Sequence, residues 1–318
     1  MLAGMRTIGI DVGGTKVLGV ALDTEQPSTV VHEHRVRTPT GGDGLVEVVA
    51  DLVATLAGRG GPPAAVGVGV PGLVDTGGVL RTGPHLPNVT NLALASDLGA
   101  RCGVPVAVEN DANCHAVAEH RGGAAAEVGH ALVVTLGTGI GAGIIHDGRL
   151  LRGAYGFAGE PGHMVIDPYG PPCPCGRRGC WEQFASGHGL ARLARSAALG
   201  GHLAAVVDAA GGDPELVRGE HITAAARQGD PDALAVLDEL ADWIGLGLAN
   251  LVNVLDPELV VIGGGLVDAA DLLLPRAEAL VHAHALGGDL RPLVPVVAAR
   301  LGERAGAIGA GLLAAELL

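Results

Sequence analysis

Apolar residues recur with two different periods along this chain, and the changes of period predict its helices and strands. After Asp43, which we place at a helix N-cap, apolar residues recur at helical spacing from residue 45 to residue 56. A second helix is expected to begin within residues 109–113 and to continue to about residue 120. Short apolar runs predict strands at residues 7–11, 17–22, 30–37, 65–70 and 104–108. The first three strands follow one another closely, so we expect an antiparallel meander.

The second half of the chain repeats the glycine-containing hairpin with which the first half begins. Strands are predicted on either side of a turn at residues 137–141, as they are on either side of residues 12–16. The other predicted elements in this half are strands at 131–136, 142–146 and 259–262, a helix at 231–255 capped by Asp230, and a small-residue helix at 305–317. Alternating helices and strands in two related halves predict an α/β protein.

The composition is that of a large folded protein without a nucleic-acid partner. The 318 residues are 48% apolar, with a mean hydropathy of +0.39, which suits a sizeable core. A net charge of −14 argues against nucleic-acid and anionic-membrane surfaces. The amino terminus lacks an apolar signal-peptide core, and no stretch approaches the roughly 18 apolar residues of a membrane span. We therefore expect no membrane association and a cytoplasmic protein.

Residues 160–182 contain the densest group of metal-binding residue types in the chain. Cys173, Cys175 and Cys180 lie within eight residues, and His163 lies ten residues upstream of the first. Two cysteines one residue apart in an extended segment point to opposite sides and do not easily form a disulfide. Three thiolates and one imidazole are instead a ligand set of tetrahedral structural zinc sites. The alternative is a glycine-rich loop with free thiols.

Two glutamates flank this cluster. Glu160 precedes His163 by three residues, and Glu182 follows Cys180 by two. A zinc-bound imidazole keeps one ring nitrogen free for a hydrogen bond, and together with two carboxylates it suits a polyhydroxylated ligand such as a sugar. Aromatic residues make up only 2% of the chain, so such a site would depend on hydrogen bonds more than on stacked rings. The alternative, two solvated loop glutamates, stays open.

Three glycine-containing turns are candidates for phosphate binding. Residues 11–16, DVGGTK, place bare backbone N–H groups together with Thr15 and Lys16 in a tight turn between strands. The spacing is not that of a Walker P-loop, and a strand follows where that motif requires a helix. A single turn of this type is more often a simple hairpin, but residues 137–141 and the glycine run 263–265 add two more. Together they predict a nucleotide held between two lobes.

Asp111 is the best candidate for a general base. It lies in the sequence ENDAN at residues 109–113, directly after a buried strand and at the edge where open α/β sheets bind ligands. Phosphoryl transfer needs a carboxylate that orients and deprotonates the attacking hydroxyl. The alternative role for Asp111 is a helix N-cap, although Asn110 or Asn113 could fill that position and leave Asp111 free to act.

Other polar and sulfur-containing residues have simpler interpretations. His115 and Glu119, one helical turn apart, are more typical of a solvated helix face than of a metal pair. Cys102 and Cys114 are interpreted as core or near-core thiols. Of the 13 histidines, only His163 stands in a ligand-like context.

In combination, these motifs resemble the ROK family of sugar kinases within the actin-like ATPase superfamily, and in particular its bacterial glucokinases. The resemblance covers nearly the whole chain. It rests on the motifs DVGGTK, GVPGLVD, ENDAN, LGTGIG, EPGH, CPCGRRGCWE and IGGG at residues 11–16, 69–75, 109–113, 136–141, 160–163, 173–182 and 262–265.

The fold implied by this resemblance is the two-lobed actin-like ATPase fold, which is ribonuclease H-like, with a zinc-stapled loop inserted. A small α/β lobe would cover residues 1–120, and the closing helix near residues 305–318 would pack on it. A large α/β lobe would cover residues 121–318 and include the zinc-binding loop at residues 160–182.

The resemblance also implies roles for individual residues. Asp111 would be the base that acts on the 6-hydroxyl of the sugar. The other hydroxyls would be bound by Asn110, Glu160, His163 and Glu182, with Gly72 and Asn88 nearby. The ATP phosphates would be held by Gly13, Gly14, Thr15, Lys16, Thr138 and Gly139, the adenosine would border Gly263 and Gly264, and Asp11 would lie close to Mg²⁺. Zn²⁺ would be bound by His163, Cys173, Cys175 and Cys180 and would order the sugar loop without taking part in phosphoryl transfer.

The activity implied is that of an ATP-dependent glucokinase acting on glucose and Mg-ATP, in a cytoplasmic homodimer or homotetramer. An N-acetylmannosamine or N-acetylglucosamine kinase of the same family is the nearest alternative. A sugar-sensing repressor would need a DNA-binding helix-turn-helix ahead of the first strand, and few residues precede that strand. A zinc-stapled sugar-binding protein without catalysis is disfavoured by Asp111 and the two phosphate turns.

Overall fold

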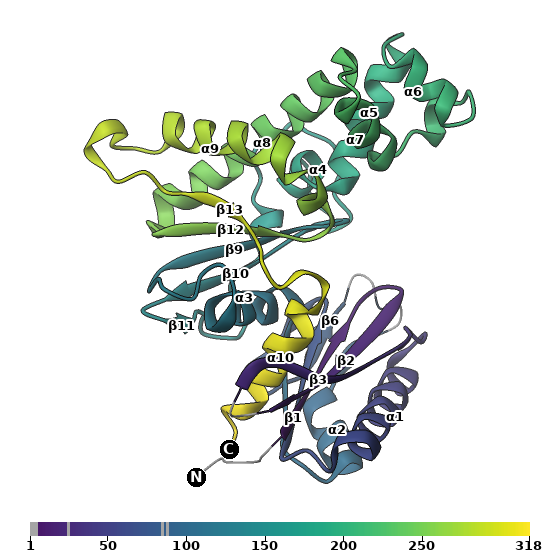
Figure 1. Ribbon diagram of the computed structural model, residues 1–318, viewed down its shortest axis with the longest axis vertical. Coiled ribbons are helices and arrows are strands. Elements are labelled where there is room, and N and C mark those ends of the chain that lie inside the picture. Colours follow the sequence, from purple (N-terminus) through teal and green to yellow (C-terminus); the bar gives the residue numbers. More distant parts are fainter. Residues whose placement is uncertain (1–5, 24–25, 84–85, 87–88) are drawn as a thin grey trace. The chain divides into compact units, whose positions relative to one another are not determined.

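The computed structural model describes residues 6–23, 26–83, 86 and 89–318 (Figure 1). The chain divides into two compact units. Unit 1 comprises residues 1–133, 142–159 and 299–318, and unit 2 comprises residues 134–141 and 160–298. Strands and helices occur in both units, so the predicted α/β class is confirmed. Within the described residues, no helix is long and apolar enough to cross a membrane.

Unit 1 is built on a five-stranded sheet. In the order β3-β2-β1-β4-β8, its strands are Gln26–Arg37, Lys16–Asp23, Arg6–Val12, Ala65–Val70 and Val106–Asn110. The first three strands pair antiparallel, which confirms the predicted meander, whereas β1-β4 and β4-β8 pair parallel. Every residue of β4 is buried, because a central parallel strand is covered on both faces.

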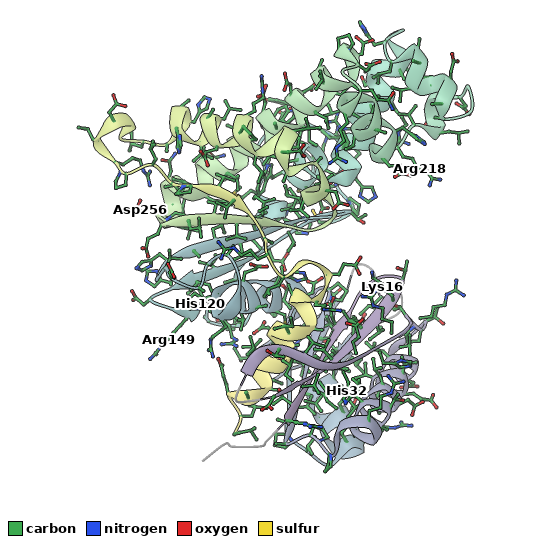
Figure 2. All side chains as sticks on the ribbon, in the orientation of Figure 1. Lys16, His32, His120, Arg149, Arg218 and Asp256 are labelled. Atoms are coloured by element: carbon green, nitrogen blue, oxygen red, sulfur yellow. The ribbon has the colours of Figure 1, made fainter. Side chains whose placement is uncertain are left out.

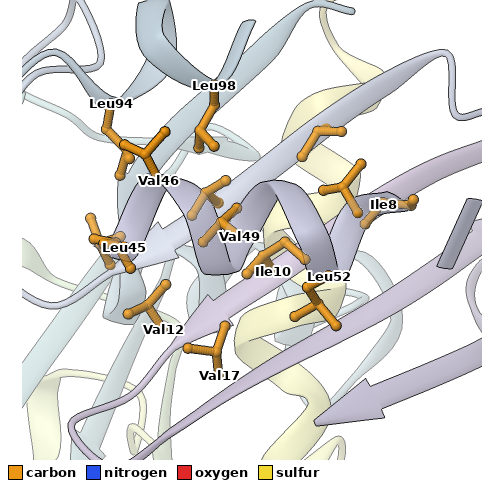
Figure 3. Packing of buried hydrophobic residues seen from close by; sticks show 14 of the residues in the cluster. Ile8, Ile10, Val12, Val17, Leu45, Val46, Val49, Leu52, Leu94 and Leu98 are labelled. Atoms are coloured by element: carbon orange, nitrogen blue, oxygen red, sulfur yellow. The ribbon is translucent and has the colours of Figure 1, made fainter. Parts of the chain in front are cut away.

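Helices cover both faces of this sheet, at Gly42–Gly60 (α1), Leu94–Cys102 (α2), Asp111–Gly122 (α3) and Ala305–Ala315 (α10). α1 and α2 bury one core against the sheet, in which Ile10 and Leu45 are almost fully enclosed (Figure 3). α3 and α10 bury the other core, which includes Cys114, as predicted. Neighbouring residues of β2 divide between the two cores, Val17 joining the first and Leu18 the second, as strand geometry requires.

α10 packs closely on this sheet because the sheet presents glycines to it (Figure 1). A Cβ atom added at Gly9 in β1 would lie 1.9 Å from the backbone oxygen of Ala307, and one added at Gly67 in β4 would lie 1.8 Å from that of Ala310. The small residues of α10 complete the fit, and residues 305–314 are all buried. The docking of α10 therefore depends on backbone-to-backbone contact that no larger side chain would allow.

Two boundaries differ from the prediction. The N-cap of α1 is Gly41, and Asp43 lies in the first turn of that helix without a side-chain capping bond. The assignment of Asp43 as N-cap is wrong, because Gly41 with its φ of +81° lets the chain enter the helix two residues earlier. β8 extends to Asn110, because its polar end continues the parallel pairing with β4.

A small antiparallel sheet in unit 1 was not predicted from the sequence. Its strands are β5 (Leu73–Val74), β6 (Leu80–Thr82) and β7 (Thr90–Leu92). Strands of two or three residues are too short to show a period of two. The turn between β5 and β6 is held by Asp75, whose carboxylate accepts hydrogen bonds from the backbone N–H groups of Gly77 and Val79.

The second five-stranded sheet has the order β11-β10-β9-β12-β13, with strands Arg149–Leu150, Ile140–His146, Ala131–Leu136, Leu259–Gly263 and Val296–Ala298. The hairpin of β9 and β10 and the strand β12 confirm the prediction. β12 and β13 pair parallel, and β10 and β11 pair antiparallel.

The helices of unit 2 are Glu182–Ala185 (α4), Gly187–Leu199 (α5), Ala204–Ala209 (α6), Gly219–Arg227 (α7), Pro231–Leu255 (α8) and Ala270–His284 (α9). Short 3₁₀ helices occur at Pro161–His163, Pro214–Leu216, Gly265–Ala269, Gly288–Leu290 and Gly302–Arg304, the last of them in unit 1. The side chain of Asp230 caps α8, as predicted, and accepts a hydrogen bond of 2.9 Å from Ala233.

Candidate active site

The carboxyl ends of β1 and β8 carry two aspartates in unit 1. Both strands run parallel to β4, which lies between them, and Asp11 and Glu109 each pair with Gly69 of β4. Asp111 follows β8 directly, as the first residue of α3. Open α/β sheets bind ligands at this edge. The fold of unit 1 therefore places both predicted aspartates at the edge where chemistry is expected.

Asp11 is held where ionisation is costly. A Cβ atom added at Gly306 of α10 would lie within 3.0 Å of both of its carboxylate oxygens. Burial is the main reason that the pKa of Asp11 is raised to about 6. His115 and Lys16 lower this pKa, and the carboxylate of Asp111 raises it. A carboxylate in this state gains stability when a cation binds beside it.

Asp111 is not needed as the cap of α3. The N-cap is Asn110, whose side-chain oxygen accepts a hydrogen bond of 3.1 Å from the backbone N–H of Asn113. Asp111 lies in the first turn, where the helix dipole favours negative charge. One of its carboxylate oxygens accepts a hydrogen bond of 2.9 Å from the N–H of Ala112, which fixes the orientation of the group. The competing N-cap interpretation of Asp111 is thereby wrong.

Glu109 and Arg152, which the sequence analysis did not assign, hold this strand end in place. The buried carboxylate of Glu109 accepts hydrogen bonds of 3.0 Å from the backbone of Asn110 and from the side chain of Asn113. Its other oxygen pairs with Nε of Arg152 at 2.6 Å. A buried carboxylate is tolerated only with such partners. The sequence offered no signal for Arg152, because it lies 43 residues away.

Gly72 and Asn110, both predicted to lie near the sugar, are in direct contact. The side-chain amide of Asn110 donates a hydrogen bond of 3.1 Å to the backbone oxygen of Gly72. Gly72 has a φ of +124°, and an added Cβ atom would lie 2.1 Å from the backbone oxygen of Thr82. Asn88, the remaining predicted sugar ligand of this region, lies outside the described residues.

The first glycine turn, residues 13–15, is exposed over most of its length and joins β1 to β2. The N–H of Gly13 donates a hydrogen bond of 2.9 Å to the backbone oxygen of Lys16, and the hydroxyl of Thr38 donates one of 2.6 Å to the oxygen of Gly13. The ammonium group of Lys16 pairs with Glu303 at 2.9 Å, on the protein surface. Lys16 is therefore positioned by a weak, exchangeable contact.

The second glycine turn, residues 137–139, is braced by Glu182 within unit 2. The carboxylate of Glu182 accepts a hydrogen bond of 3.0 Å from the backbone N–H of Ile140. It also fills the space beside Gly139, where an added Cβ atom would lie 2.2 Å from a carboxylate oxygen. The N–H of Gly187, at the start of α5, donates a hydrogen bond of 2.8 Å to the oxygen of Gly137.

The other predicted nucleotide residues of unit 2 adjoin this turn. Thr138 is exposed at its tip. Gly263 ends β12, and Gly264 follows it with a φ of +85°. A Cβ atom added at Gly264 would lie within 2.8 Å of three backbone atoms of Leu136, the residue before the turn. The structure thus brings the glycine run and the second turn together.

The four predicted zinc ligands form one cluster in unit 2. One donor atom from each lies within 4.8 Å of the others. Sγ of Cys173 lies 3.9 Å from Nδ1 of His163, and Sγ of Cys175 lies 3.6 Å from Sγ of Cys180. Two thiolates on one tetrahedral zinc ion would lie about 3.8 Å apart, given Zn–S bonds of about 2.3 Å. The donor set and its spacing fit a zinc ion.

The cysteine loop is anchored to the body of unit 2 by a tryptophan. Trp181 lies between Cys180 and Glu182 and is fully buried, and its ring N–H donates a hydrogen bond of 2.8 Å to the backbone oxygen of Trp243 in α8. Gln183 directs its amide toward Sγ of Cys173 at 3.6 Å. The residues around Cys180 therefore connect the cluster to α8 on one side and to Glu182 on the other.

Glu160 and His163 lie close together, at the 3₁₀ turn that begins after Glu160. The backbone N–H of His163 donates a hydrogen bond of 3.2 Å to the backbone oxygen of Glu160, and both residues are half-buried. The carboxylate of Glu182 is bonded to the second glycine turn. The alternative of a solvated loop residue is therefore wrong for Glu182.

The prediction of a solvated face is also wrong for Glu119. Glu119 is fully buried, and its carboxylate accepts hydrogen bonds from the backbone N–H groups of Ala124, Arg300 and Leu301. His115 is half-buried. A helical spacing of four residues does not distinguish a face toward solvent from one covered by another segment, here the chain that leads into α10.

A model of the ROK family matches residues 7–316. The chain is 41% identical to a glucokinase of Streptomyces coelicolor over 314 residues and 35% identical to a glucokinase of Thermotoga maritima over 315, with 98% of each chain covered. The crystal structure of a ROK family glucokinase from Streptomyces griseus in complex with glucose and AMPPNP matches with a TM-score of 0.87 at 38% identity, covering 98% of this chain and 99% of that one. The similarity thus extends over both units.

Proposed function

The chain belongs to the ROK family, and from that membership we propose that it is an ATP-dependent glucokinase, which transfers the γ-phosphoryl group of ATP to the 6-hydroxyl of glucose. The observation that carries the proposal is the position of Asp111, in the first turn of α3 at the ligand-binding edge of the sheet, with the capping role taken by Asn110. The glucokinases among its relatives, one of them bound to glucose and AMPPNP, support the choice of substrates.

Asp111 is assigned as the general base. As the bond between the sugar oxygen and the γ-phosphorus forms, the bond between that phosphorus and the β–γ bridging oxygen of ATP breaks and ADP leaves, while the hydroxyl proton passes to a carboxylate oxygen of Asp111. The hydrogen bond from Ala112 to one oxygen holds the carboxylate in a fixed orientation. Asp111 lies in the first turn of α3, where the helix dipole favours negative charge.

The nucleotide is assigned to the glycine turns and to the glycine run. The residues proposed for the phosphates are Gly13, Gly14, Thr15, Lys16, Thr138 and Gly139, and those proposed for the adenosine are Gly263 and Gly264. Asp11 is proposed to lie beside Mg²⁺, and the raised pKa of its buried carboxylate suits a partner of that charge. When bound, Mg²⁺ would neutralise part of the charge that develops on the phosphate oxygens.

The sugar is assigned to Gly72, Asn88, Asn110, Glu160, His163 and Glu182. Among these, the side chains of Asn110 and Glu182 are held by hydrogen bonds to the backbone. The cluster geometry supports a zinc ion that holds His163 through Nδ1, which leaves Nε2 for a sugar hydroxyl. Bound Zn²⁺ would act as a structural staple for the loop. Family resemblance alone supports the further proposal of a cytoplasmic homodimer or homotetramer.

The test is ADP release by purified protein with Mg-ATP and a panel of glucose, mannose, N-acetylglucosamine and N-acetylmannosamine. We expect a strong preference for glucose. Preference for an N-acetyl sugar would retain the phosphoryl-transfer mechanism and overturn the choice of substrate, and absence of turnover on every sugar would overturn the kinase assignment.

The role of Asp111 is tested with Asp111→Asn, which keeps the shape of the side chain and removes the base. We expect kcat to fall by about 10²–10⁴-fold while glucose binding, measured by calorimetry, is retained. Asp97→Asn is the matched control, because Asp97 is an exposed aspartate in the first turn of α2. Equal rates for Asp111→Asn and Asp97→Asn would exclude Asp111 as the base.

A further inference from the structure

Two histidines and an aspartate form a second cluster of metal-binding residue types, in unit 1 and outside every site assigned above. Nδ1 of His130 lies 3.2 Å from Nδ1 of His146, and the two rings meet edge to face. One carboxylate oxygen of Asp147 lies 3.4 Å from Nε2 of His130, and the other lies 3.7 Å from Nε2 of His146. One donor atom from each residue lies within 4.8 Å of the others.

The local backbone fixes this arrangement. His146 ends β10, and Asp147 and Gly148 form the two-residue turn into β11 with φ angles of +49° and +69°. Asp-Gly is a preferred sequence for such hairpins, because both central residues need a positive φ. The N–H of Gly148 donates a hydrogen bond of 2.9 Å to the oxygen of Gly129, which brings the residue before His130 against the turn.

The spacing suits two ligands on one cation. Two imidazole nitrogens on a tetrahedral zinc ion would lie about 3.3 Å apart, given Zn–N bonds of about 2.0 Å, and the Nδ1 atoms of His130 and His146 are 3.2 Å apart. The carboxylate of Asp147 faces the Nε2 atoms of the same two rings, so a rotation of these partly exposed side chains brings all three residues to one ion. A direct hydrogen bond between the two imidazoles would give the same distance, but it would not require Asp147 to approach both rings. The side chains of His146 and Asp147 are 60% and 78% exposed, which leaves room for water to complete the coordination.

We propose that His130, His146 and Asp147 bind a second zinc ion, distinct from the one at the cysteine cluster. Two imidazoles and one carboxylate suit Zn²⁺, Ni²⁺ or Cu²⁺, whereas Mg²⁺ and Ca²⁺ prefer all-oxygen sites. The ligands come from the segment that precedes β9, the end of β10 and the turn into β11. The ion would therefore join the start of β9 to the end of β10.

The experiment measures zinc per chain after equilibration with zinc and removal of the free ion by gel filtration. We expect His130→Ala and His146→Ala to hold one ion fewer than the unmodified protein. His202→Ala is the matched control, because His202 is 66% exposed and lies 3.5 Å from Asp232. It belongs to neither cluster of metal-binding residues found among the described residues, so we expect it to retain the full zinc content.

A second measurement uses nickel as the probe and does not depend on the cysteine cluster. The untagged protein and His202→Ala should be retained on immobilised Ni²⁺, and His146→Ala should elute earlier. Asp147→Asn should weaken zinc binding at this site by at least about tenfold in a calorimetric titration. Each variant changes a partly or largely exposed side chain, and its fold is checked by thermal unfolding without metal.

Equal zinc content and equal nickel retention for the unmodified protein, His130→Ala and His146→Ala would overturn the proposal. Loss of the ion in both histidine variants, with full affinity in Asp147→Asn, would overturn the assignment of Asp147 as a ligand. The loss of the same ion in His202→Ala would show that the decrease is not specific to this cluster, and it would also overturn the proposal.

Discussion

The two glycine turns proposed for ATP phosphates look alike in sequence but are supported in different ways. The first, residues 13–15, is tied to Thr38 by its backbone, and the next residue, Lys16, pairs with Glu303 on the protein surface (Figure 2). The second, residues 137–139, is supported by two hydrogen bonds. The carboxylate of Glu182 accepts one from Ile140, directly after the turn, and the N–H of Gly187, at the start of α5, donates the other to the oxygen of Gly137. The first turn is therefore easy to rearrange, whereas the second is held by a charged group from a neighbouring loop.

The difference matters because Glu182 also stands next to the cysteine cluster. Cys180, Trp181 and Glu182 are consecutive, and Trp181 is anchored in the core of unit 2. A displacement of Cys180 would therefore move Glu182, which is two residues further along the chain, and would disturb its hydrogen bond to the second turn. This effect does not require a bound sugar. The resemblance assigned zinc to the sugar loop alone, whereas this chain of contacts extends its proposed effect to the nucleotide.

The largest effect that is expected on KM comes from Cys175→Ala. Removal of one thiolate should abolish zinc binding at the cluster, and the loss of order should raise the KM for glucose and also the KM for ATP, each by about 10–100-fold. Metal analysis and steady-state kinetics measure both. Cys102→Ala is the control, because Cys102 is a half-buried thiol outside the cluster. A raised KM for glucose with an unchanged KM for ATP would break the proposed link to the second turn.

The next effect separates the two turns directly. Glu182→Gln weakens the charge-assisted bond to Ile140, so we expect the KM for ATP to rise by about tenfold. Glu303→Gln weakens only exposed contacts, those of Glu303 with Lys16 and Arg35, and we expect the KM for ATP to change by less than about twofold. Zinc content should stay the same in both variants. Equal kinetic effects of the two substitutions would show that the turns do not differ in their support.

The sequence predicted those parts of this picture that depend on local patterns. The hairpins of both turns, the cap at Asp230 and the cysteine cluster all follow from periodicity, turn chemistry or ligand spacing. The position of Asp111 after a buried strand could also be predicted. Its competing role as an N-cap was decided by a single hydrogen bond, from Asn113 to Asn110.

The rest could not be predicted, because it depends on contacts between distant residues. Glu182 and Ile140 are 42 residues apart, and Glu119 and Arg300 are 181 apart. In both pairs a glutamate accepts hydrogen bonds from backbone N–H groups of a distant segment, and no local pattern in the sequence names that segment. Burial of a charged residue of this kind becomes visible only when the partner segment is in place.

A smaller effect is expected in thermal unfolding without ligands. Gly139→Ala places a Cβ atom 2.2 Å from the carboxylate of Glu182, which must move and weaken its bond to Ile140. We expect a loss of about 1–3 kcal/mol in the free energy of unfolding. Gly137→Ala is the matched control in the same turn, because nothing lies within 4 Å of its added Cβ atom. Equal melting temperatures for the two variants would contradict the bracing role of Glu182.

An effect of similar or smaller size is expected from Asp11, which lies near the end of β1, beside the first turn. The pKa of Asp11 is raised by burial from its usual 3.8 to about 6, so the native state favours the protonated form. Because the native state binds this proton more tightly than the unfolded state does, the proton stabilises the native state. That stabilisation is fully present below pH 3.8 and is lost as the pH rises through 6. Asp11→Asn cannot ionise, so without ligands it should unfold at a higher temperature than the unmodified protein at pH 8. The difference in the free energy of unfolding between the two proteins, at most about 3 kcal/mol, should disappear toward pH 4. A constant difference across this range would mean that Asp11 is not the titrating group. A difference that follows this course would show that ionisation of Asp11 lowers the stability of unit 1 beside the first turn. The carboxylate beside the second turn, that of Glu182, is instead held by a hydrogen bond from the backbone N–H of Ile140.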